Sequence, residues 1–140
     1  MISAIDTNVL VALWDRDDTL NSTAQAALDT AFARGKLVIS GAVYAELLAF
    51  PRRTEAFLNQ FLHDTEIAVD WTIDEAVWRT AAKSFQKYAN RRRKQRAGQL
   101  RRILADFLIG AHALENGYSL VTLDQGIYRA AFPKLHIVRI

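Results

Sequence analysis

Four acidic residues stand where carboxylates are useful for chemistry. Asp6 directly follows the first apolar run of the chain, and Asp124 comes two residues after Thr122, where a later apolar run ends. Glu46 and Asp106 instead interrupt apolar helical stretches, each directly before a large apolar residue. Four carboxylates gathered at one place repel one another unless they are protonated or neutralised by a cation. The pattern therefore predicts an acidic, cation-binding site.

The ligand types indicate which cation this site would hold. The chain has no Cys and only three, widely spaced His residues, so hard oxygen ligands favour Mg²⁺ or Mn²⁺ over zinc. Such an ion can orient a phosphodiester, help activate water and stabilise charge on the leaving oxygen. Ordinary structural roles remain open for each acid: helix capping for Asp6, first-turn placement for Asp106, partial exposure for Glu46 and turn formation for Asp124.

Helical geometry indicates where the two acids within helices point. Glu46 and Asp106 each lie roughly 60° from the centre of their buried stripe, on the same side. Asp106 is expected well inside its helix. Both acids should therefore lie at the margin of the core, where a cleft can reach them. The stripes consist of Val43, Leu47 and Phe50 in one helix and of Ile103, Phe107, Gly110 and Leu114 in the other.

Short apolar runs alternate with helical stretches along the chain, which indicates an α/β fold. We expect a three-layer sandwich with helices flanking a mostly parallel sheet of about five strands. Ligands bind such sheets beyond the carboxyl ends of the strands, near the point where strand order reverses. The expected strands are 2–5, 37–39, 67–69, 118–122 and 137–138. The expected helices are 6–14, 21–34 (capped by Asn21 or Ser22), 41–50, 54–63, one starting at Asp74, 100–115 and 124–131. For residues 90–98 the sequence is compatible with a helix, a loop or a helix broken at Gly98.

Composition limits the class of protein. The 140 residues are 51% hydrophobic and 24% charged, which fits one globular domain spanning 1–140. The lack of Cys excludes thiolate zinc sites and cysteine nucleophiles, and it suits a reducing cytoplasm. No secretory signal opens the sequence, and no apolar run reaches the ~20 residues needed to cross a bilayer. We therefore expect a cytoplasmic protein without membrane association.

The charge is unevenly distributed. The net charge is only +3, but nine basic residues and no acidic ones lie between Lys83 and Arg102, leaving nine basic against fifteen acidic residues elsewhere. Such a segment attracts a polyanion through phosphate contacts, although a solvated helix end is an equally ordinary explanation. The candidate RNA-binding residues are Arg91, Arg92, Arg93, Lys94, Arg96, Arg101 and Arg102.

The acidic motifs, taken in order, resemble a known family. The sequence is similar to PIN domains, and specifically to VapC-type toxin ribonucleases of toxin–antitoxin pairs. The resemblance covers nearly the whole chain, including its length and element order. It rests on Ile5-Asp6-Thr7-Asn8-Val9-Leu10, Val43-Tyr44-Ala45-Glu46-Leu47, the stretch from Leu104 to Ala113 around Asp106, and Leu120-Val121-Thr122-Leu123-Asp124.

The resemblance implies a PIN-like fold and a Mg²⁺- or Mn²⁺-dependent endoribonuclease. Asp6, Glu46, Asp106 and Asp124 correspond to the family's acidic quartet, as both catalytic and metal-binding residues. Relatives usually form homodimers and are neutralised by a small VapB-type antitoxin that occludes the cleft, and the implied cellular action is translation arrest. The basic run at 91–96 is denser than the family pattern requires. The supporting polar positions are Asn8 and Thr122, for which first-turn capping and strand-end hydrogen bonding are the alternatives.

Other functions remain compatible with parts of the pattern. A nonenzymatic nucleic-acid-binding module would use the same basic segment without a metal. A PIN nuclease could act in RNA processing outside a toxin–antitoxin pair, or on DNA, because phosphate contacts do not distinguish the sugars. A phosphatase or receiver domain is disfavoured, because Thr7-Asn8 follows Asp6 where an Asp-x-Asp motif would be needed.

Overall fold

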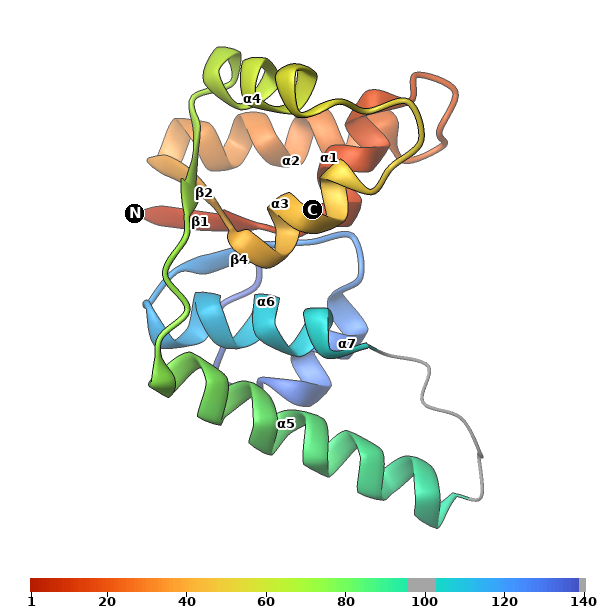
Figure 1. Ribbon diagram of the computed structural model, residues 1–140, viewed down its shortest axis with the longest axis vertical. Coiled ribbons are helices and arrows are strands. Elements are labelled where there is room, and N and C mark those ends of the chain that lie inside the picture. The colour runs from red at the N-terminus through yellow and green to blue at the C-terminus, as the bar shows by residue number, and fades with distance from the viewer. Residues whose placement is uncertain (96–102, 139–140) are drawn as a thin grey trace.

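A four-stranded parallel sheet forms the centre of the molecule. The computed structural model describes residues 1–95 and 103–138. Each strand pairs in parallel with its neighbours, in the order β3-β2-β1-β4 (Figure 1). Strand order thus reverses at β1, because β2 and β4 lie on its two sides. The strands are β1 (Ile2–Ile5), β2 (Lys36–Ser40), β3 (Ile67–Asp70) and β4 (Ser119–Val121).

The expected fifth strand is not a full strand among the described residues. Ile137 forms one isolated parallel bridge with Leu120, and the Val138 amide donates to the Leu120 carbonyl at 2.9 Å. The segment therefore extends the sheet beside β4 without forming a regular ladder. Residues 139–140 lie outside the described part of the chain.

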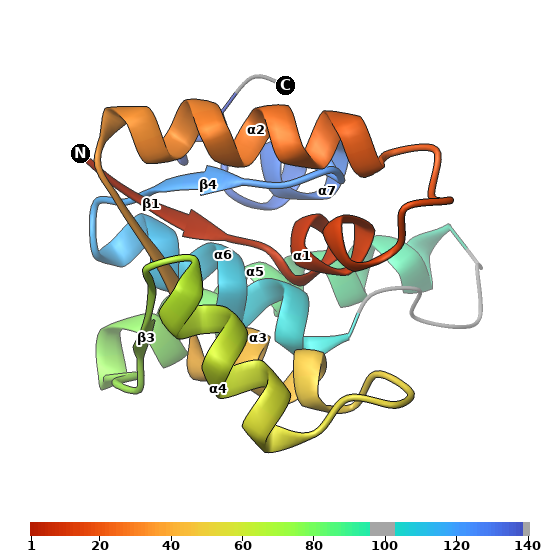
Figure 2. The same ribbon diagram turned by 90° about the horizontal axis from the view of Figure 1, so that it is seen from above.

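Helices cover both faces of the sheet, as expected for a three-layer α/β fold. In Figure 2, α2 lies on one side of the strands, and α3, α5 and α6 lie on the other. No helix of the described residues is both long and apolar enough to cross a membrane. The helices are α1 (Thr7–Trp14), α2 (Asn21–Arg34), α3 (Gly41–Leu48), α4 (Glu55–Asp64), α5 (Glu75–Lys94), α6 (Leu104–Glu115) and α7 (Gln125–Ala131).

Polar side chains begin most of the helices near the expected residues. The predicted cap of α2, however, is wrong. Leu20 occupies that position without a side-chain bond, and the Asn21 amide instead donates to the carbonyls of Ala12 and Leu13, which joins α2 to α1. Side-chain caps that accept a backbone N–H are Asp6 for α1, Ser40 for α3, Thr54 for α4 and Asp74 for α5.

The start of α6 differs from the expectation. The helix begins at Leu104, so Asp106 lies in its first turn and not well inside it. Phe107 is fully buried and stacks on Phe85 of α5 with ring centroids 4.9 Å apart, which fixes α6 against α5. This packing sets the direction of the neighbouring Asp106. The open segment 90–98 is helical as far as Lys94, and Arg96, Arg101 and Arg102 lie outside the described residues.

Candidate active site

One pocket of about 510 Å³ brings the predicted acids together. Asp6 and Asp124 reach it from the ends of β1 and β4, at the point where strand order reverses. Glu46 reaches it from α3 and Asp106 from the first turn of α6. We call this the acidic pocket. It is also lined by Thr7, Asn8, Val11, Ala12, Asp18, Leu20, Phe50 and Leu123.

Asp6 is the buried member of the set, with 5% of its surface exposed. Its Oδ1 accepts the backbone N–H of Thr7 at 2.8 Å, so the predicted capping role is real and coexists with a place in the pocket. Burial raises the pKa of Asp6 from 3.8 to about 6, and the charge of Asp106 adds to this effect, although neighbouring hydrogen-bond donors oppose it. A nearby cation would stabilise the ionised carboxylate.

Thr122 and Asn8 join the ends of β1 and β4. The Thr122 hydroxyl donates to Asp6 Oδ2 at 2.8 Å and accepts the backbone N–H of Asp124 at 3.0 Å. The Asn8 side chain accepts the Leu123 N–H at 3.1 Å and lies 3.5 Å from the Thr122 hydroxyl. Asn8 therefore bonds across to the β4–α7 connection and does not cap its own helix. Together the two residues hold Asp6 and Asp124 at fixed positions.

Glu46 has its own orienting partner. The Thr7 hydroxyl donates to Glu46 Oε1 at 2.7 Å, across 39 residues of sequence. Thr7 was part of the sequence motif but had no predicted role. The spacing between α1 and α3 could not be obtained from periodicity, so this contact could not be predicted. The hydroxyl leaves the second carboxylate oxygen of Glu46 available to the pocket.

Asp106 and Asp124 are half-buried in the same pocket. Asp106 Oδ2 accepts the Ile103 backbone N–H at 3.3 Å, so its predicted first-turn role also coexists with the pocket. Asp18, from the connection between α1 and α2, is a fifth acid in the pocket and was not predicted. It lies in a polar stretch, where an acid carries no distinguishing pattern.

Tyr128 of α7 is a second missed residue. It is 1% exposed, and its hydroxyl makes no hydrogen bond of standard geometry within the described part of the chain. Burial raises the pKa of Tyr128, and the charges of Asp6, Asp106 and Glu46 raise it further, so the phenol stays neutral beside the acids. Its proximity in turn lowers the pKa of Asp6. An aromatic residue at helical spacing predicts only core packing. The sequence therefore did not indicate that the Tyr128 hydroxyl acts on Asp6.

The donor set fits a hard divalent cation. Carboxylate and hydroxyl oxygens from several elements line one pocket, and the most buried carboxylate has a raised pKa that a cation would offset. Among residues 1–95 and 103–138, no three acidic or His side chains already converge closely enough to form a metal-ligand cluster. Ligand side chains would therefore have to draw together around the ion.

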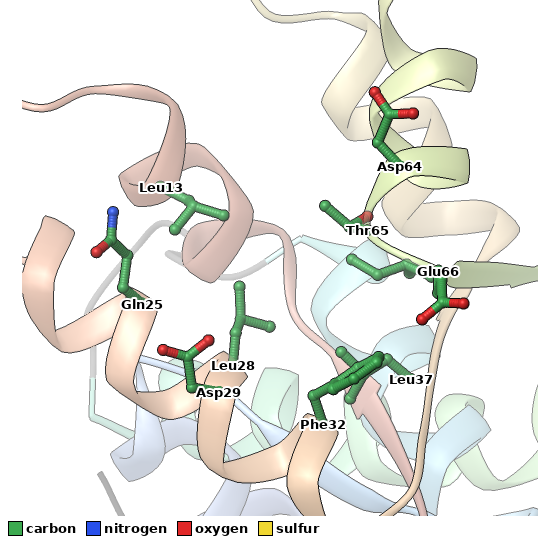
Figure 3. Close-up of a pocket in the computed structure, with 10 residues that line it drawn as sticks. Leu13, Gln25, Leu28, Asp29, Phe32, Leu37, Asp64, Thr65 and Glu66 are labelled. Atoms are coloured by element: carbon green, nitrogen blue, oxygen red, sulfur yellow. The ribbon is translucent and has the colours of Figure 1, made fainter.

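Other candidate features lie away from the acidic pocket. Arg91, Arg93 and Lys94 are exposed at the end of α5, Arg92 is half-buried there, and none lines the acidic pocket. A separate pocket of about 330 Å³ lies between α2 and the turn from α4 to β3 (Figure 3). Its lining includes Leu28, Phe32 and Glu66 but none of the predicted site residues.

The sequence profile of the PIN domain family matches residues 4–133, which is nearly the whole chain. The chain belongs to the PIN domain family. The PIN domain match includes all four carboxylates and both supporting polar residues. No curated protein sequence matches the chain.

Solved structures share the PIN fold over almost their full length. VapBC2 from Rickettsia felis, bound to a DNA fragment from its promoter, aligns with a TM-score of 0.63 at 20% identity, covering 99% of this chain and 98% of that chain. VapBC-1 from nontypeable Haemophilus influenzae aligns with a TM-score of 0.65 at 22% identity, covering 99% of this chain and 97% of that chain. FitAcB from Neisseria gonorrhoeae aligns with a TM-score of 0.62 at 23% identity, also covering 99% of this chain and 97% of that chain. At these identities the likeness shows the shared fold.

Proposed function

We propose that this PIN domain is a divalent-metal-dependent endoribonuclease. The observation that carries the proposal is the convergence of Asp6, Glu46, Asp106 and Asp124 on one pocket at the reversal of strand order. Membership of the PIN domain family supports the same reaction class. A nonenzymatic binding module would have no use for a buried carboxylate held beside other acids at a cost in folding stability.

The chain's own residues would prepare the site. Asp6 and Asp106 are the proposed principal ligands of Mg²⁺ or Mn²⁺, with Glu46 and Asp124 completing the acidic set. Thr122 and Thr7 orient two of these carboxylates through hydrogen bonds of 2.8 and 2.7 Å. When bound, the metal would supply a Lewis acid beside the scissile phosphodiester. The basic residues at the end of α5, together with Arg96, Arg101 and Arg102 later in the sequence, would counter the repulsion between RNA and the acids.

The biological setting we propose is a toxin–antitoxin pair. Solved structures with this fold include the VapBC and FitAB complexes and a toxin–antitoxin complex from Klebsiella pneumoniae. We infer a VapB-type antitoxin partner, a homodimer and translation arrest in the cytoplasm. An RNA-processing role outside such a pair is the second candidate. A short upstream gene encoding an antitoxin would favour the first, and an isolated gene the second.

The test compares Asp106→Asn with the parent protein. Total RNA is incubated with each protein in Mn²⁺ and in excess chelator, while circular dichroism checks folding. The proposal predicts cleavage by the parent in metal only, and at least about a 100-fold loss in the folded variant. Asp29→Asn, an exposed acid on α2 outside the acidic pocket, is the matched control and should cleave like the parent. Undiminished cleavage by folded Asp106→Asn would refute the assignment.

A further inference from the structure

A basic pocket of about 330 Å³ lies between the second half of α5 and the end of α7. Lys87, Arg91 and Lys94 line it from α5, at spacings of four and three residues that place them on one helix face. Ala130 and Ala131 form part of its α7 side, where small side chains leave room for a ligand. We call it the basic pocket.

The wall of the basic pocket is fixed by a contact between the two helices. The Ser84 hydroxyl, which also lines the pocket, donates to the Ala131 carbonyl at 3.3 Å. Asn90 adds an exposed side-chain amide to the same rim. The pocket therefore offers three cations and the Asn90 side-chain amide around one hollow, which suits an anion with several oxygen acceptors.

The three cations have no carboxylate partner among the residues that the structure describes. Within the described part of the chain, Lys87, Arg91 and Lys94 take part in no ion pair. Arg79, earlier on α5, differs because its guanidinium binds Glu75 at 2.9 Å. Like charges at these spacings destabilise a helix slightly. An anion held among the three side chains would relieve that repulsion.

The basic pocket lies one short helix away from the acidic pocket. The residue Asp124 lines the acidic pocket and immediately precedes α7, whereas Ala130 and Ala131 at the other end line the basic pocket. Seven helical residues span about 10 Å. In Figure 1 the C-terminal end of α5 and the start of α6 lie on the same side of the molecule. A nucleic-acid strand crossing the acidic pocket could therefore place another phosphate at the basic pocket.

We propose that the basic pocket binds a backbone phosphate of the RNA, a few nucleotides from the phosphodiester cut at the acidic pocket. This inference rests on the proposed ribonuclease function. Lys87 and Asn90 thereby join the substrate-binding surface, Ser84 holds α5 against α7, and α7 separates the two phosphate positions. The contact supplies affinity and register along the strand without reading bases.

The first experiment measures binding of a labelled single-stranded RNA over a range of KCl concentrations. All proteins carry Asp106→Asn, so that the RNA stays intact. Adding Lys87→Gln with Arg91→Gln should weaken binding about tenfold and reduce the salt dependence by about one to two ion equivalents. Lys83→Gln is the matched control, because Lys83 is exposed one turn earlier on α5 and does not line the basic pocket. It should change affinity less than twofold.

The second experiment locates the phosphate. RNA oligonucleotides each carry one neutral methylphosphonate in place of a phosphate, at successive positions from the cut site. One position should weaken binding to the Asp106→Asn protein but cause no further loss when Lys87→Gln and Arg91→Gln are also present. Equal losses at every position, or a Lys83→Gln effect as large as that of the pocket variants, would overturn the proposal. Cleavage by the parent protein tests the ribonuclease function separately. A failure of the phosphate-binding proposal can therefore be distinguished from a failure of the ribonuclease proposal.

Discussion

The hydroxyl of Thr122 donates a 2.8 Å hydrogen bond to the buried carboxylate of Asp6, joining residues 116 positions apart in the sequence. The same hydroxyl accepts the backbone N–H of Asp124 at 3.0 Å. One side chain therefore sets the positions of two acids that approach the acidic pocket from different strands. This arrangement explains how a threonine that is fully buried at the end of β4 can position the acids of the pocket.

We expect Thr122→Val to reduce both stability and cleavage. Valine has nearly the same shape but removes the donor to Asp6 Oδ2 and the acceptor of the Asp124 N–H, while the Thr7 N–H still binds Asp6 Oδ1. The expected cost is about 1–3 kcal/mol in the free energy of unfolding, measured by urea denaturation, with a fall in the cleavage rate. Thr122→Ser keeps the hydroxyl and should recover most of both quantities. Equal behaviour of the two variants would contradict this role for the hydroxyl.

Stability without metal should depend on pH through Asp6. Because burial raises the pKa of this carboxyl from 3.8 to about 6, the folded state holds its proton more tightly than the unfolded state. This contribution to stability is present below about pH 4 and is lost as the pH rises through about 6. The contribution of Asp6 to the free energy of unfolding decreases by roughly 3 kcal/mol over this range. Denaturation in chelator between pH 4 and 7.5 measures the change.

The control for this pH effect is Asp6→Asn. It removes the titrating group, so the decrease between pH 4 and 7 should become smaller, and the variant should be more stable than the parent at pH 7.5. Mg²⁺ or Mn²⁺ should stabilise the parent most at the higher pH, where Asp6 is ionised, and should stabilise the variant less. A parent whose stability without metal is unchanged or rises over this range would contradict the raised pKa.

Removal of the Thr7 hydroxyl should affect catalysis more than folding. Thr7→Val deletes the 2.7 Å hydrogen bond to Glu46, which is half-buried and can reach solvent when released. We expect cleavage to fall about tenfold, corresponding to about 1.4 kcal/mol, while the thermal midpoint changes little. Thr30→Val, at an exposed position of α2, is the matched control. Unchanged cleavage in Thr7→Val would show that Glu46 needs no orienting partner.

Tyr128→Phe tests the contact between α7 and the acids. The phenol lowers the pKa of Asp6, so its removal should raise that pKa above the parent's value, as followed by carbon NMR of the Asp6 carboxyl. Stability should change by less than about 1 kcal/mol, because the deleted hydroxyl has no standard hydrogen-bond partner among the described residues. An unchanged or lower pKa for Asp6 would show that the hydroxyl does not act on it.

The sequence predicted most of the fold because local patterns determine it. The apolar run before Asp6 and the Gly35 that ends α2 gave element boundaries close to those observed. Gly110 was expected in the buried stripe of its helix, and the structure adds the reason for glycine: a Cβ there would overlap the ring of Phe132. That contact is long-range, and no local pattern encodes it.

The sequence predicted the four carboxylates of the pocket but not all of the side chains that act on them. Each acid alone was a weak signal, but their joint placement at strand ends and on core-flanking helix faces was unusual enough to be recognised. The contacts of Thr7 with Glu46 and of Tyr128 with Asp6 depend on how α1, α3 and α7 pack. Asp106 was placed too deep in its helix because α6 starts later than its apolar periodicity indicated.

A crystal structure of the protein soaked in Mn²⁺, with anomalous data that locate the ion, will show whether Asp6 and Asp106 bind metal together. We expect a Mn²⁺ peak in the acidic pocket within direct coordination distance of carboxylate oxygens of Asp6 and Asp106, and loss of that peak in Asp106→Asn. A fully occupied Mn²⁺ site elsewhere, with the acidic pocket empty of metal at millimolar Mn²⁺, would contradict it.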